Sequence, residues 1–130
     1  MFCLGTELAL LFSVMFLRDT VFCRLTFVLM ELARQLTWCE EEVSLFHYRT
    51  RDQVEVDAVL ENRRGDVVGI EVKAASTVGS DDFRGLRHLA QRIGHDFRAG
   101  IVMHTGSQAL PFGPKMLAIP VSALWLTSTG

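Results

Sequence analysis

The sequence predicts a single α/β domain built around a mixed β-sheet, with its elements in the order α-β-β-β-α-β-β. Apolar residues recur at helical spacing over residues 20–38 and alternate with a period of two between residues 43 and 74. A second helical stripe lies over residues 80–94, between the third and fourth strands. Because a helix between two strands usually joins a parallel pair, the order indicates both parallel and antiparallel pairing in one sheet. A chain of 130 residues suits one such domain.

The first half of the chain supplies one helix and three strands. Six apolar residues form the stripe of the helix over residues 20–38: Val21, Leu25, Val28, Leu29, Leu32 and Leu36. Polar turns near residues 51–53 and 62–65 then separate three alternating or nearly continuous apolar runs. These runs predict strands over residues 43–48, 54–61 and 66–74.

The second half begins with a helix and ends with two strands. Ser80 is the expected N-cap, Gly94 the expected end, and the apolar stripe consists of Phe83, Leu86, Leu89, Ala90 and Ile93. Strands are predicted over residues 98–104 and 116–119, and a last helical turn over residues 121–125.

Composition excludes several classes of protein. Apolar residues make up 49% and charged residues 22%, which is typical of globular domains and excludes a disordered tail, a collagen-like rod and a disulfide miniprotein. The formal net charge of −2 is not that of a strongly basic nucleic-acid-binding module, so contact with DNA would need a local patch. Three cysteines without C-x-x-C spacing indicate reduced thiols in a cytoplasmic protein. The apolar run Leu8–Leu17 is ten residues, whereas a bilayer requires about 20, so no membrane segment is expected.

The turn at residues 62–65 sets the register of the two strands that it joins. A three-residue loop with Gly65 in the left-handed conformation places Asn62 opposite Asp66. The same register places Asp57 opposite Glu71, and the β-carbons of such opposed residues are roughly 5 Å apart. The spacing therefore predicts that two carboxylates lie together on one face of the sheet.

Lys73 is two residues beyond Glu71 and is expected on the same face. Two carboxylates can bind one Mg²⁺ or Mn²⁺, and a neighbouring ammonium can stabilise the charge that develops during phosphodiester cleavage. The alternative interpretation is a solvated face or a structural ion pair. A loop that differs by one residue would also move Asp57 to the opposite face.

An ordered series of motifs resembles the PD-(D/E)XK signature of the restriction-endonuclease-like superfamily. Within it, the chain is most similar to an uncharacterised nuclease-like domain found at the C-terminus of many prokaryotic AAA-type ATPases. The similarity runs from about Thr26 to Trp125. It is carried by Glu31-Leu32, Leu45-Phe46-His47-Tyr48-Arg49, Glu55-Val56-Asp57, Ile70-Glu71-Val72-Lys73, Phe83-Arg84-Gly85-Leu86, Gly100-Ile101-Val102 with Thr105-Gly106, and Ile119-Pro120 with Ala123-Leu124-Trp125.

The resemblance implies a restriction-endonuclease-like αβββαβ core with one additional C-terminal strand. It implies Asp57 and Glu71 as metal-binding and catalytic acids and Lys73 as the catalytic lysine. The superfamily often adds a glutamate from the first helix, and here Glu31 is the possible accessory residue, although pairing with Arg34 or Gln35 on the helix surface is an equal alternative. The resemblance places a domain over residues 26–130, preceded by an atypical apolar segment over residues 1–25.

The resemblance also points to an ATPase as a partner. No G-x-x-x-x-G-K-[ST] motif occurs in the sequence, so it contains no ATP site of that type. The ATPase domain would be missing from this chain, which is then interpreted as a fragment or rearrangement of a longer ancestor.

The helix over residues 80–94 has a polar, basic side formed by Arg84, Arg87, His88 and Arg92. Such a side can contact a phosphate backbone, and a solvated face is the alternative.

Two functions remain open from the sequence. The first is a metal-dependent phosphodiesterase that acts on DNA or RNA, and the second is a non-catalytic module for nucleic-acid or partner binding. The apolar segment at residues 1–25 is expected to form a homodimer, or alternatively a helical hairpin within one monomer.

Overall fold

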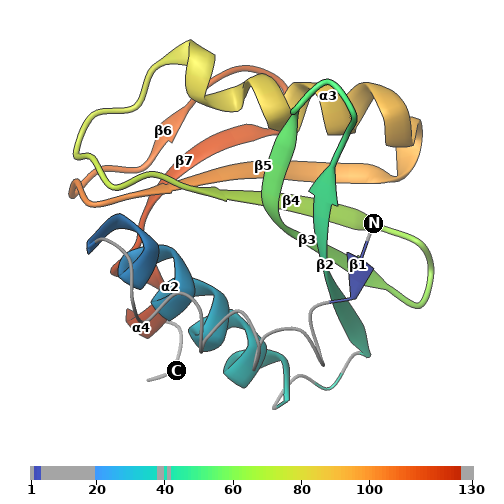
Figure 1. The fold of residues 1–130 in the computed structure, drawn as a ribbon, viewed down its shortest axis with the longest axis horizontal. Helices are drawn as coiled ribbons and strands as arrows, with labels where there is room; N and C mark the ends of the chain where they lie inside the picture. Colours follow the sequence, from blue (N-terminus) through green and yellow to red (C-terminus); the bar gives the residue numbers. More distant parts are fainter. Residues whose placement is uncertain (1, 4–19, 38–39, 41, 127–130) are drawn as a thin grey trace.

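The computed structural model describes residues 2–3, 20–37, 40 and 42–126, and these form a sheet with a helix packed on each face (Figure 1). The elements in chain order are β1 (Phe2–Cys3), α2 (Thr20–Leu36), β2 (Val43–Arg49), β3 (Glu55–Asn62), β4 (Val67–Val72), the 3-10 turn η1 (Ser80–Phe83), α3 (Arg84–Ile93), the 3-10 turn η2 (Gly94–Asp96), β5 (Phe97–His104), β6 (Leu110–Pro111), β7 (Met116–Pro120) and α4 (Ala123–Leu126).

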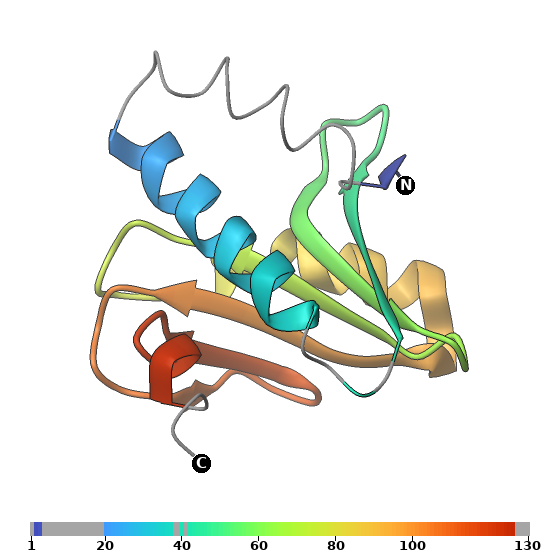
Figure 2. The same ribbon diagram turned by 90° about the horizontal axis from the view of Figure 1, so that it is seen from below.

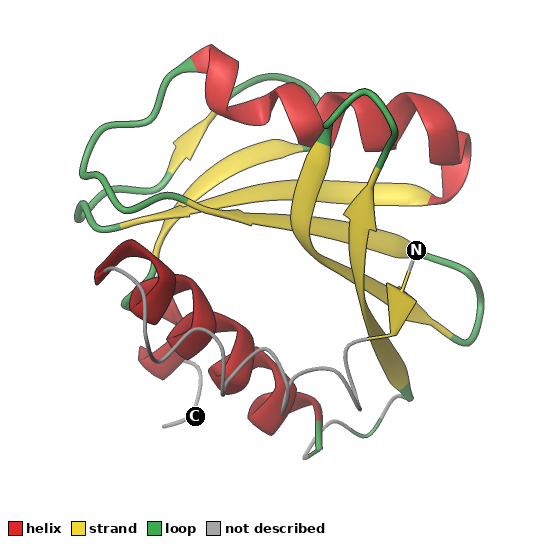
Figure 3. Cartoon of the chain, in the orientation of Figure 1, coloured by secondary structure: helices red, strands yellow, loops and turns green. Residues whose placement is uncertain are grey.

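The sheet is mixed, as the sequence predicts. Its strand order among the described residues is β1-β2-β3-β4-β5-β7-β6. The pairs from β1 to β4 are antiparallel, whereas β4–β5 and β5–β7 are parallel. The predicted α/β class and the order of its main elements are therefore confirmed (Figure 3). The strands β1 and β6 were not expected, because two-residue strands are too short to produce a periodic pattern.

The β3–β4 hairpin has the predicted register. Gly65 has φ +87°, and the four printed pairs run from Glu61 opposite Val67 to Ala58 opposite Ile70, which is the register that the loop predicts. The ladder ends at Ala58, one residue before Asp57. The Asn62 side chain fixes the loop because its Oδ1 accepts hydrogen bonds from the backbone N–H groups of Arg64 and Asp66, each at 3.0 Å.

The start of the α3 region differs from the prediction that Ser80 is its N-cap. The cap residue of η1 is Gly79, whose backbone N–H donates to Asp82 Oδ2 at 2.7 Å. An acid three residues into the turn reaches back to this amide, as in a capping box. The Ser80 Oγ instead lies 3.2 Å from Arg87 Nη1, which donates to it. Gly94 ends α3 with φ +77°, as expected.

The two faces of the sheet carry separate apolar cores. Between the sheet and α3, the core includes Val56, Val59, Phe83, Leu86, Leu89, Phe97 and Val102. Between the sheet and α2, it includes Val28, Leu32, Ala58, Ile70, Met103 and Leu124. Figure 2 shows α2 crossing the sheet on the side opposite α3, with α4 beside it.

Most of the apolar segment at residues 1–25 lies outside the described residues, so its self-association stays a prediction. Within the described ranges, every helix falls short of the length and apolar character that a membrane span requires.

Candidate functional site

A β-bulge in β3 sets the position of Asp57. Phe46 pairs with Val59 and Tyr48 pairs with Val56, so Asp57 and Ala58 together lie opposite the single residue His47. The His47 Nδ1 lies 3.3 Å from the backbone oxygen of Asp57. The last β3–β4 pair is Ala58 with Ile70, and the two strands lose their regular ladder beyond it.

The Asp57 carboxylate links β3 to the end of β4 beyond the last backbone pair. Its Oδ2 accepts a hydrogen bond from the backbone N–H of Val72 at 2.7 Å. Burial raises the pKa of Asp57, an effect that outweighs the Val72 hydrogen bond and the nearby His47. Asp57 therefore has a backbone partner and is half-buried, and it does not line the cleft described next.

Glu71 lies in a cleft of about 530 Å³ at the end of β4. Its Oε2 atom is buried and has no hydrogen-bond partner among the described residues. Burial raises the pKa of Glu71 to about 8, and the neighbouring charge of Asp57 acts in the same direction. A buried carboxylate oxygen without a partner is costly, because its desolvation is not compensated by a hydrogen bond or a cation.

Lys73 lines the same cleft and is held by an acid nine residues further along the chain. Its Nζ lies 2.5 Å from Oδ2 of Asp82, in η1, and the two side chains are 32% and 26% exposed. Burial acts to raise the pKa of Asp82, but the hydrogen bonds from Lys73 and Gly79 hold it below its usual value. The predicted trio is thus arranged as two groups: Glu71 and Lys73 line the cleft, and Asp57 lies beside it.

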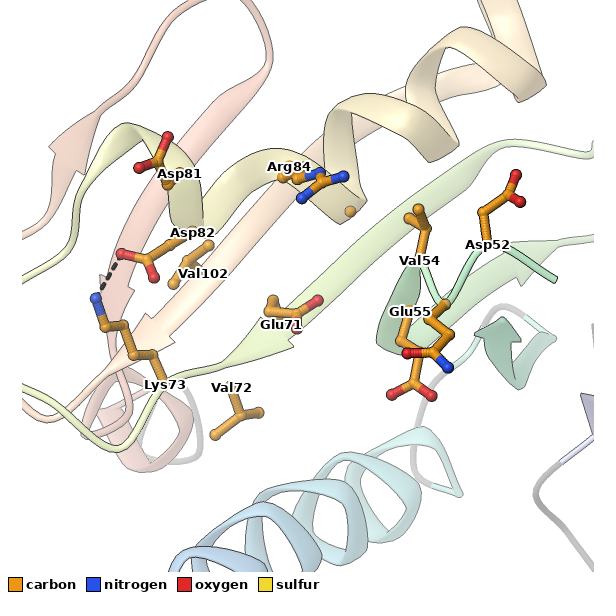
Figure 4. Close-up of a pocket in the computed structure, with 12 residues that line it drawn as sticks. Asp52, Val54, Glu55, Glu71, Val72, Lys73, Asp81, Asp82, Arg84 and Val102 are labelled. Carbon is orange, nitrogen blue, oxygen red and sulfur yellow. Dashed lines mark hydrogen bonds and ion pairs between the residues drawn. The ribbon is translucent and has the colours of Figure 1, made fainter. Parts of the chain in front are cut away.

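The cleft is strongly acidic, with five carboxyl groups and two basic side chains among its lining residues. Figure 4 shows Glu71 between the Lys73–Asp82 pair on one side and Glu55 with Asp52 on the other. Four of these acids, Asp52, Glu55, Asp81 and Asp82, are not predicted as site residues from the sequence. Glu55 is part of the Glu55-Val56-Asp57 motif, but no spacing along the chain indicates that the other three share a cleft with Glu71.

The donor atoms of this region fit a divalent cation in part. The free Oε2 of Glu71 and the adjacent Asp57 are oxygen donors of the kind that Mg²⁺ and Mn²⁺ prefer. Among the described residues, no group of three or more His, Cys, Asp and Glu side chains is close enough to hold a metal ion. The site therefore provides two carboxylates, and further ligands would have to come from backbone oxygens, water or substrate.

Glu31 is placed away from this cleft. It lies on α2, which packs on the opposite face of the sheet (Figure 2). Its carboxylate accepts hydrogen bonds from Arg34 at 2.5 Å and from Gln35 at 3.0 Å. The structure thus shows the helix-surface pairing that was the alternative for this residue.

The four basic residues of α3 have different neighbours. Arg84 lines the acidic cleft, whereas Arg87 donates to the backbone oxygen of Ser80 at 2.9 Å. His88 is 3.2 Å from the hydroxyl group of Tyr48. Arg92 lines a different cleft, on the far side of Asp52.

A family model described as a domain of unknown function (DUF4143) matches residues 26–124. No curated protein and no solved structure matches the chain. Because the match covers most of the chain, this protein belongs to the DUF4143 family.

Proposed function

We propose that this chain is a metal-dependent, nuclease-like domain of the PD-(D/E)XK type. In this proposal Asp57 and Glu71 bind one Mg²⁺ or Mn²⁺ ion, and Lys73 is the catalytic lysine. The substrate is a phosphodiester of DNA or RNA. An AAA-type ATPase is the proposed partner, since such ATPases often occur with the family to which the chain belongs.

The observation that carries the proposal is the buried Oε2 atom of Glu71, which has no partner among the described residues. The Asp57 carboxylate is near enough to raise the pKa of Glu71 further. Functional sites often contain two buried carboxyl groups that each raise the pKa of the other. A bound cation compensates the negative charge of both groups and so favours their ionised forms. The other carboxyl groups that line the cleft also favour a bound cation, because they add negative charge.

Each residue has a distinct task in the proposed reaction. A bound divalent ion would polarise the phosphoryl oxygen and lower the pKa of a bound water. Asp57 and Glu71 would hold that ion, and the Val72 N–H fixes the orientation of the Asp57 carboxylate. The Lys73 ammonium supplies positive charge where negative charge develops, and Asp82 holds it in position until substrate is bound.

A second candidate function is a non-catalytic, partner-binding module. It is favoured by the close Lys73–Asp82 ion pair, which occupies the ammonium group that catalysis would need. In such a module the acidic cleft would bind a basic segment of a partner without any reaction.

Calorimetric titration with Mn²⁺ tests the metal site directly. We expect binding by the wild type and a loss of binding in Glu71→Gln and in Asp57→Asn, which keep the shape of each side chain. Glu61→Gln is the matched control, because Glu61 lies on β3 at the opposite end of the hairpin and outside the cleft. Unchanged Mn²⁺ affinity in Glu71→Gln would overturn the metal site.

Cleavage of a labelled DNA or RNA strand then separates the two candidate functions. We expect Lys73→Ala to lower turnover by about 10²–10³-fold while Mn²⁺ affinity is retained, since Lys73 is not a ligand. A wild-type protein that binds Mn²⁺ but cleaves neither nucleic acid would favour the non-catalytic module.

A further inference from the structure

A second cleft, of about 580 Å³, shares Asp52 with the acidic cleft but has the opposite charge. Three arginines line it: Arg49 at the end of β2, Arg51 in the following turn and Arg92 near the end of α3. Asp52 is the one carboxylate among its lining residues. This basic cleft brings together arginines that are up to 43 positions apart in the sequence.

Two of the three guanidinium groups are available to a ligand. Arg49 forms an ion pair with Glu55 at 3.0 Å. Arg51 and Arg92 are exposed, and neither forms a hydrogen bond or ion pair with any other residue in the part of the chain that the structure describes. A guanidinium presents its N–H donors in a planar fork that matches two phosphate oxygens.

The turn that carries Arg51 is held in one conformation. The backbone N–H of Thr50 donates to the oxygen of Val54 at 2.9 Å, and the N–H of Val54 donates to the Thr50 hydroxyl at 3.2 Å. Gln53 closes the turn with φ +60°, and its N–H donates to the Thr50 oxygen at 3.2 Å. The backbone on which Arg51 is mounted is thus fixed before any ligand arrives, which lowers the entropic cost of binding.

The cleft also has an apolar side. Tyr48 is 8% exposed and Ile93 is half-buried, and both line the cleft together with the arginines. The Tyr48 hydroxyl group is 3.2 Å from His88, which ties this side of the cleft to α3. Arginines beside an apolar side suit a nucleic-acid strand, because its phosphates are anionic and the faces of its bases are apolar.

We propose that Arg51 and Arg92 bind the phosphodiester backbone of a nucleic-acid strand that extends past Asp52 into the acidic cleft. The inference deepens the proposed function and rests on it, because it assigns the substrate class to a surface next to Glu71. It also separates substrate binding from the metal site, since the acidic cleft by itself repels a phosphate backbone.

Fluorescence anisotropy of a short labelled DNA strand tests this inference, in buffer with EDTA so that no cleavage occurs. We expect the double variant Arg51→Ala/Arg92→Ala to bind more weakly at low salt. The slope of log affinity against log salt concentration should fall by roughly one for each arginine removed. An RNA strand of the same sequence should show the same loss, because the phosphate contacts are shared.

Arg63→Ala is the matched control, because Arg63 is 80% exposed and lies in the β3–β4 loop, outside both clefts. Arg51→Glu, a single change on an exposed turn, should weaken binding more than Arg51→Ala. An unchanged salt slope in the double variant would overturn the inference, as would preferential Arg51-dependent binding to anionic phospholipid vesicles. Failure here is distinguishable from failure of the metal site, because Mn²⁺ titration is done without nucleic acid.

Discussion

The two faces of β4 have opposite characters, although both are built from the same six-residue strand. On the α2 side, Val68 and Ile70 pack into an apolar core, where Ile70 is 2% exposed. On the α3 side, Gly69 lies under Leu86, and Glu71 extends into the acidic cleft. Alternation along a strand sends neighbouring residues to opposite faces, so one short sequence supplies both a core and a site.

The difference arises from how far each helix covers the strand. The α2 core includes Val72, whereas on the other face of β4 Glu71 is not part of the α3 core and lines the cleft. Substitutions on the α2 side should therefore change stability alone. Substitutions on the α3 side near Glu71 should change stability and cation binding together.

The largest expected effect is on the α2 face. Ile70→Ala should lower the free energy of unfolding by about 2–5 kcal/mol, because it leaves a cavity in a closed core. Urea unfolding measures this loss, and Mn²⁺ affinity should be unchanged at temperatures where the variant is folded. A parallel loss of Mn²⁺ affinity in the folded variant would break the contrast between the two faces.

Gly85→Ala should produce the next largest effect. A β-carbon at Gly85 would lie 2.4 Å from the backbone oxygen of Glu55, so α3 and β3 would have to move apart. Overpacking of this kind costs about 1–3 kcal/mol, and here it would also displace a wall of the acidic cleft. Thermal unfolding and Mn²⁺ titration should both detect the change. Gly79→Ala is the control, since its β-carbon would have no atom nearer than Asp82 Oδ2 at 3.8 Å.

The free energy of unfolding should depend on pH mainly through the ionisation of Glu71. Its pKa is raised from 4.5 to about 8 in the folded protein, so the folded state keeps a proton that the unfolded state releases. The contribution of Glu71 to the free energy of unfolding is therefore fully present below pH 4.5. It falls as the pH rises towards 8, by at most about 1.4 kcal/mol per pH unit. Asp57, whose pKa is also raised by burial, adds to this fall.

Urea unfolding at several pH values in EDTA tests this dependence. Glu71→Gln should flatten it and should stabilise the protein at pH 8, where the wild type holds a buried charge near Asp57, Glu55 and Asp82. The carboxylates with lowered pKa values, Glu31, Asp66 and Asp82, titrate at more acidic pH than Glu71. A Glu71→Gln variant with the wild-type pH profile would contradict the assignment of burial as the cause.

The smallest effect is expected at Glu31 of α2. Glu31→Gln removes the charge of the Glu31–Arg34 pair but keeps a hydrogen-bond acceptor, and the pair contributes little because Arg34 is 58% exposed and water screens it. Unfolding free energy should stay within the scatter of the measurement, and Mn²⁺ affinity should not change. Weaker Mn²⁺ binding in this variant would restore Glu31 as an accessory residue of the site.

The sequence by itself determined the elements and the hairpin register. The apolar spacing in α2, the alternation in β2 and β3, and Gly65 in a three-residue loop are local properties of the chain. They were sufficient to predict the pairing of β3 with β4 as far as Ala58 opposite Ile70. Such features can be predicted from the sequence because each depends on residues that are close together along the chain.

The tertiary structure decided which side chains share a cleft. The bulge that places Asp57 against the Val72 amide depends on pairing with β2, which the β3–β4 hairpin does not specify. Lys73 forms its ion pair with Asp82 because η1 folds back over the end of β4. Arg51 and Arg92 line one cleft because the β2–β3 turn lies next to α3. These partners are set by the packing of distant segments, and no local pattern along the chain encodes that packing.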